Sequence, residues 1–143
     1  KPAYDELSYP TTPHLKQRID FLVKNNQASL ATIAVDSDAY ILYQKLTTSP
    51  DKGHRIIGPG EAASIALAKI YNGIVASNNL KDISSYISEF NLKHITTGDI
   101  LVEAFEKGYI TEDGGNTIWI SMVEKRRKLG ATSFSEYIEI RSK

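Results

Sequence analysis

The stretch "IIGPGEAASIALAKIYNGIVASNNLKDI", residues 56–83, decides which fold we expect. Pro59 and Gly60 introduce a helix from Glu61 to about Tyr71, since proline is favoured in the first turn of a helix. The alanines of this helix leave a smooth surface that can lie very close to a sheet. Gly73 ends the helix, and the apolar run that follows is too short for another helix. We therefore predict a helix packed on a short buried strand.

Composition limits the class of protein. The chain has 143 residues, 41% of them hydrophobic and 24% charged, which is typical of a globular protein. A formal net charge of zero gives no global attraction to nucleic acid, and the lack of cysteine excludes disulfides and thiolate metal sites. No apolar run approaches the roughly 20 residues of a membrane helix, and no signal peptide is visible. We expect one cytoplasmic domain over residues 1–143 that does not enter a membrane.

Helices and strands alternate along the chain. Helices are expected at Pro2–Leu7, from Pro13, at about Asp38–Leu46, at 80–90, at 97–108, at about Thr117–Leu129 and at Ser133–Arg141. The expected caps are Thr12 for the helix that begins at Pro13, Asp36 or Ser37 for the helix at Asp38–Leu46, and Thr97 for the helix at 97–108. Strands are expected at 28–36, 73–78 and 92–97, and "TEDGGN" (111–116) is expected to be a loop. The alternation predicts an α/β fold with a parallel sheet and helices on both faces.

Three segments carry a resemblance to a known family. They are "PAYDELSYP" (2–10), "GPGEAASIALAKIYNGIVASNN" (58–79) and "FNLKHITTGDILVEAFEKGYI" (90–110). In this order they resemble PIN-like domains, and most closely a prokaryotic subgroup related to toxin–antitoxin ribonuclease toxins. The resemblance covers roughly residues 1–109. It implies a Rossmann-like parallel sheet flanked by helices, Mg²⁺ or Mn²⁺ as cofactor, and hydrolysis of single-stranded RNA.

The resemblance also assigns site residues. Glu6 matches the acid of the family's "E-L" segment, and Glu61 matches the acid before the alanine-rich helix. Asn79 stands where the family has an aspartate, and Asp82 is one helical turn further on. Clustered oxygen ligands suit Mg²⁺, which activates water and neutralises phosphate charge. The expected catalytic residues are Glu6, Glu61 and Asp82, the expected metal ligands are Glu6, Glu61, Asn79 and Asp82, and the expected pocket residues are Ser77, Asn78 and Thr97.

One family acid has no match in the chain. It belongs to an N-terminal strand, and "AVDSDAY" (34–40) follows the "E-L" segment and so has the wrong order. We therefore expect the first strand and helix to lie upstream of Lys1.

Two functional hypotheses remain open. The first is a metal-dependent ribonuclease, with single-stranded RNA as substrate, an antitoxin-like protein as partner, and homodimerisation as the family implies. The alternative is a non-catalytic PIN-fold module that binds a protein or RNA, because Asn79 contributes no charge to a metal site. Glu61 and Asp82 also have a simpler interpretation as first-turn acids of helices. Asn78, Asn79 and Thr97 have a simpler interpretation as helix caps. Trp119 has a simpler interpretation as a core residue.

Overall fold

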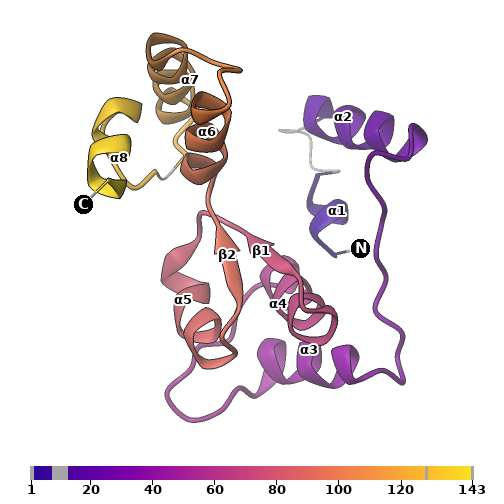
Figure 1. Ribbon diagram of the computed structural model, residues 1–143. Helices are drawn as coiled ribbons and strands as arrows, with labels where there is room; N and C mark the ends of the chain where they lie inside the picture. The colour runs from indigo at the N-terminus through magenta and orange to yellow at the C-terminus, as the bar shows by residue number, and fades with distance from the viewer. Residues whose placement is uncertain (1, 8–12, 128, 143) are drawn as a thin grey trace. The chain divides into compact units, whose positions relative to one another are not determined.

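The computed structural model describes residues 2–7, 13–127 and 129–142 (Figure 1). The sequence expectation of a cap at Thr12 falls outside these residues. The elements are α1 (Pro2–Glu6), α2 (Pro13–Lys24), α3 (Asp38–Thr48), α4 (Pro59–Tyr71), β1 (Ile74–Ala76), α5 (Leu80–Glu89), β2 (Lys93–Ile95), α6 (Thr97–Glu106), α7 (Glu112–Glu124) and α8 (Phe134–Arg141).

The predicted Rossmann-like α/β fold is wrong. The described structure is 61% helical and has a single parallel sheet of two strands, β1 and β2. The strand expected at residues 28–36 is not formed, and in this segment Leu30 and Val35 are 47% and 68% exposed. β-forming residues make a strand only where another strand accepts their backbone hydrogen bonds. The described sheet ends at β1 and β2, so this segment stays outside it.

The prediction of a loop at residues 111–116 is also wrong, because most of this segment forms the first turns of α7. The Thr111 hydroxyl accepts a hydrogen bond from the Gly114 N–H at 3.1 Å and caps the helix. Two acids follow in the first turn, where they complement the helix dipole. Gly115 is buried against the ring of Phe134, and this packing offsets the poor helix propensity of glycine.

The chain divides into two compact units. The first comprises Lys1–Val75 and Lys81–Lys93, and the second comprises Ala76–Leu80 and His94–Lys143. Whether they count as one domain over residues 1–143 stays a prediction. In the described part of the chain, no helix has the length and apolar character needed to cross a membrane.

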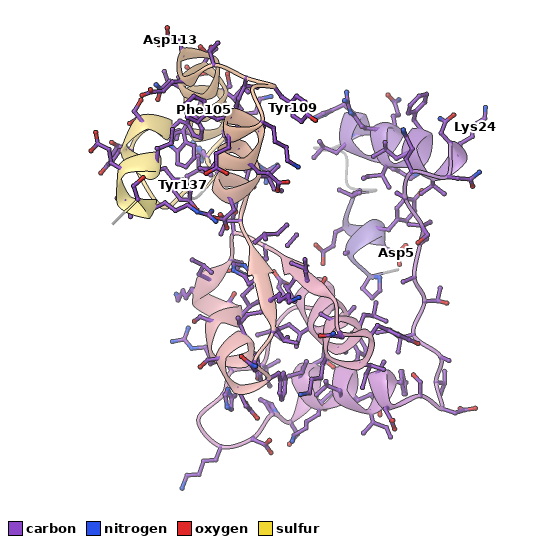
Figure 2. All side chains as sticks on the ribbon, viewed as in Figure 1. Asp5, Lys24, Phe105, Tyr109, Asp113 and Tyr137 are labelled. Carbon is purple, nitrogen blue, oxygen red and sulfur yellow. The ribbon has the colours of Figure 1, made fainter. Side chains whose placement is uncertain are left out.

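Each unit has its own apolar core. In the first unit α3 packs on α4, and the α4 alanines lie in the core together with Val75 of β1. In the second unit the core lies between α6, α7 and α8, where Phe105 and Tyr137 flank the buried rings (Figure 2). Trp119 and Phe134 are fully buried there, which confirms the core position expected for Trp119.

Candidate functional site

The N-terminal end of α4 is built from "GPGE". Gly58 is the N-cap residue with extended backbone angles, and it has no side chain to cap the helix. Pro59 occupies the first turn, which needs no backbone N–H from it. Glu61 also lies in this turn, where a carboxylate is favoured by the helix dipole. The remaining N–H groups of the first turn make this end attractive to acidic groups.

Two carboxylates approach the glycines of this helix end. A Cβ atom added to Gly60 would lie 2.6 Å from Oε1 of Glu6, and one added to Gly58 would lie 2.7 Å from Oε2 of Glu61. Glu6 arrives from α1, which packs against α4. Each carboxylate therefore occupies space that the missing methyl group leaves open. The structure brings together, at one helix end, two acids that are 55 positions apart in the sequence.

The other predicted metal ligands lie elsewhere in the chain. Asp82 is in the first turn of α5, in the first unit, and Asn79 belongs to the second unit. Within the residues that the structure describes, no group of three or more His, Asp or Glu side chains is placed to hold a metal ion. A site formed by all four predicted ligands therefore stays a prediction.

The predicted pocket residues make local hydrogen bonds in the second unit. The Asn78 amide oxygen accepts from the Thr97 backbone N–H at 2.9 Å, and the Asn78 amide nitrogen donates to the Thr97 hydroxyl at 2.9 Å. Asn78 thus ties the end of β1 to the first turn of α6. The Ser77 hydroxyl accepts from the Asn79 N–H at 3.1 Å, and the Ser77 carbonyl lies 2.7 Å from Nε2 of His94.

Thr96, and not the expected Thr97, caps α6. The Thr96 hydroxyl and the Asp99 carboxylate form a reciprocal capping box. The same carboxylate accepts from the Tyr137 hydroxyl at 2.9 Å and pairs with Arg141, both of α8. The pattern "TTGD" predicts a helix N-cap, and the sequence indicates no further role for Asp99. No local pattern indicates that its other partners lie about forty residues further along the chain.

A small hollow lies beside this capping network, and its volume is about 180 Å³. The lining residues all belong to the second unit and are Asn78, Leu80, Thr96, Gly98, Trp119, Leu129, Gly130 and Tyr137. Of the predicted pocket residues only Asn78 lines it. The polar side chains at its wall already bond to Thr97 and Asp99, so the hollow offers mainly apolar surface.

The first unit also holds a polar cluster that the sequence did not indicate. Nε2 of His54 pairs with Glu89 at 2.8 Å, and the imidazole stacks on Tyr86 with ring centroids 4.8 Å apart. The Tyr86 hydroxyl donates to the Arg55 carbonyl at 2.6 Å. Burial raises the pKa of Tyr86, and the nearby charges of Glu89 and Asp51 raise it further. This cluster fixes the loop between α3 and α4 on α5.

Comparisons with protein-family models, with curated proteins and with solved structures found no match.

Proposed function

We propose that this chain is a Mg²⁺- or Mn²⁺-dependent hydrolase of phosphodiester bonds in single-stranded RNA, with Glu6 and Glu61 as metal ligands. The observation that carries this proposal is the convergence of both carboxylates on the start of α4, against the two glycines of "GPGE". The resemblance assigns both acids to its predicted set of metal ligands. The two carboxylates form an acidic site at one helix end.

The donor chemistry fits a hard divalent cation. Glu6 and Glu61 offer carboxylate oxygens, which are the ligands that Mg²⁺ and Mn²⁺ prefer. When bound, such an ion supplies activated water and charge neutralisation at the phosphate. The protein's own part is to hold the carboxylates at the helix end, where glycine permits their close approach.

Further proposals rest on the resemblance alone. They are an antitoxin-like protein and a second copy of the chain as partners, and a cytoplasmic location. Ser77, Asn78 and Thr97 are proposed to shape the substrate pocket. Because the Asn78 amide and Thr97 bond to each other, we propose that they hold the β1 and α6 ends in place instead of donating to the substrate.

A second candidate function is a non-catalytic module that binds a protein or RNA. It is favoured by the neutral side chain of Asn79 and by the lack of a third acid beside Glu6 and Glu61 in the described part of the chain. A module of this kind keeps the acids as dipole-complementing surface charges.

Calorimetric titration with Mn²⁺ tests the metal site. We expect binding with a dissociation constant near or below millimolar, as for weakly held divalent ions. Glu6→Gln and Glu61→Gln should each abolish it. Asp5→Asn is the matched control, since Asp5 is the exposed acid next to Glu6 on α1 and should leave binding unchanged. Equal binding by all four proteins would refute the site.

Cleavage of a labelled single-stranded RNA of mixed sequence separates the two functions. The hydrolase requires cleavage that depends on Mn²⁺ and is lost in Glu61→Gln. Metal binding without cleavage would favour the binding module, and circular dichroism on each variant confirms that the helices are intact.

A further inference from the structure

Three consecutive cations follow the last residue of α7. Lys125, Arg126 and Arg127 are all exposed, and we call these three residues the basic run. Among the residues that the structure describes, none forms an ion pair with the basic run. The other lysine and arginine side chains described in the second unit are both paired, Lys107 with Glu103 and Arg141 with Asp99. The basic run therefore concentrates the unpaired positive charge of this unit at one helix end.

The backbone of the basic run is strained at Arg126. Its φ angle of 56° lies in the left-handed region that favours glycine. The Arg126 N–H donates to the Val123 carbonyl at 2.8 Å, and the Arg127 N–H donates to the Met122 carbonyl at 3.0 Å. These two bonds close α7 with a Schellman motif, in which glycine is the usual left-handed residue. An arginine at this position costs stability, and the turn itself does not need its side chain.

The helix dipole alone does not account for three cations. The C-terminal end of a helix is equivalent to about half a negative charge, and its effect is confined to the last turn. Lys125 is the C-cap residue of α7 and is sufficient to balance that charge. Glu124, the exposed acid before the basic run, adds one negative charge. The three positive charges outweigh both, so this helix end is locally positive although the whole chain has no net charge.

We propose that the basic run binds consecutive phosphate groups of a single-stranded nucleic acid. Lysine and arginine attract phosphate by charge, and the arginine guanidinium also donates two parallel hydrogen bonds to one phosphate. A flexible single strand carries one negative charge per nucleotide and can follow a short row of exposed cations. The choice of RNA as the probe rests on the proposed function. The binding surface itself requires neither a metal ion nor the carboxylates of Glu6 and Glu61.

Fluorescence anisotropy of a labelled single-stranded RNA, with EDTA present, measures binding to the full chain without cleavage. We expect a dissociation constant of about 10⁻⁴ M or lower at low salt, and a slope of about −2 for log affinity against log salt, as three phosphate contacts predict. Arg127→Gln should weaken binding about threefold or more and reduce the magnitude of the slope by about 0.7. Lys107→Gln is the matched control, because it makes the same charge change at a paired lysine and should leave binding unchanged.

Arg126→Gly separates ligand binding from a structural role. Glycine relieves the left-handed strain, so the melting temperature should rise by about 3 °C. The affinity for RNA should fall by about threefold or more, because one phosphate contact is lost. Arg126→Lys keeps the charge and should keep most of the affinity.

The proposal is overturned if the parent chain binds no RNA in EDTA, if Arg126→Gly binds RNA as tightly as the parent, or if Lys107→Gln weakens binding equally. The proposed hydrolase is tested separately. RNA binding that depends on the basic run in a chain without affinity for Mn²⁺ would refute the hydrolase and support this inference. Cleavage that depends on Mn²⁺, together with RNA binding that is unchanged in the Arg126 and Arg127 variants, would do the reverse.

Discussion

Gly60 and Gly115 lie in different units and are covered by different kinds of side chain. A Cβ added to Gly60 meets the carboxylate end of the long, exposed side chain of Glu6. A Cβ added to Gly115 meets the ring of Phe134, which is fully buried. The comparison shows that one residue type serves two purposes. In the first unit glycine leaves room for a movable acid, and in the second it leaves room for a fixed core ring.

The largest effect is expected for Gly115→Ala. The added methyl group overlaps the fully buried ring of Phe134, which packs against Phe105 and Trp119. Overpacking of this kind costs about 3 kcal/mol of unfolding free energy. Urea denaturation followed by Trp119 fluorescence measures the change. Gly130→Ala is the control, since its nearest atom would be at an ordinary 3.6 Å in the ring of Tyr137. A Gly115→Ala chain as stable as the control would contradict the described core.

Tyr86 is expected to make the stability of the first unit depend on pH in the alkaline range. Its pKa is raised mainly by burial, so its folded state favours the neutral phenol that donates to Arg55. The stabilisation is complete below the ordinary tyrosine pKa of about 10 and is lost as the pH rises through the folded pKa. Tyr86→Phe should cost about 1 kcal/mol at neutral pH. The difference between the two proteins should shrink above pH 10, and a difference independent of pH would argue against the buried donor.

Glu136 is expected to make the stability of the second unit depend on pH in the acidic range. Hydrogen bonds from the Thr132 hydroxyl and backbone N–H lower the pKa of this carboxyl. Because the pKa is lower in the folded state, the ionised carboxyl stabilises the protein above the ordinary glutamate pKa. This stabilisation is lost as the pH falls through the folded pKa. Glu136→Gln should flatten the acid limb of the stability curve. Melting temperatures between neutral pH and pH 3 measure this, and parallel curves for the two proteins would exclude the contribution.

The sequence predicted most helices because their boundaries carry local signals. Pro13 and Pro59 mark the starts of α2 and α4, and the cap at Ser37 is confirmed by its bond from the Tyr40 N–H. The strand at 28–36 was predicted wrongly, because strand formation depends on a pairing partner that local sequence does not reveal. The start of α7 was missed because Gly115 looks like a helix breaker until Phe134 is seen against it.

The candidate site was predictable only in part. Glu6 and Glu61 were assigned through the resemblance, and only the folded chain shows that they approach the same helix end. The pair of glycines in "GPGE" is the signal that could have indicated it, because two glycines around one proline leave space for nearby side chains. The bonds from Asp99 to α8 depend on tertiary packing and have no local signature.

Mn²⁺ calorimetry on Gly60→Ala tests the metal site at the start of α4 with both acids kept, and this variant has the smallest expected effect on stability. The methyl group should displace the flexible end of Glu6, while the gain in helix propensity offsets the cost of that shift. We expect unchanged unfolding in urea together with Mn²⁺ affinity lowered by about tenfold or more, because Glu6 is displaced and not removed. Gly130→Ala should bind Mn²⁺ as the parent chain does. A Gly60→Ala chain that binds Mn²⁺ as tightly as the parent, or a parent that binds none, would contradict a metal site at the start of α4.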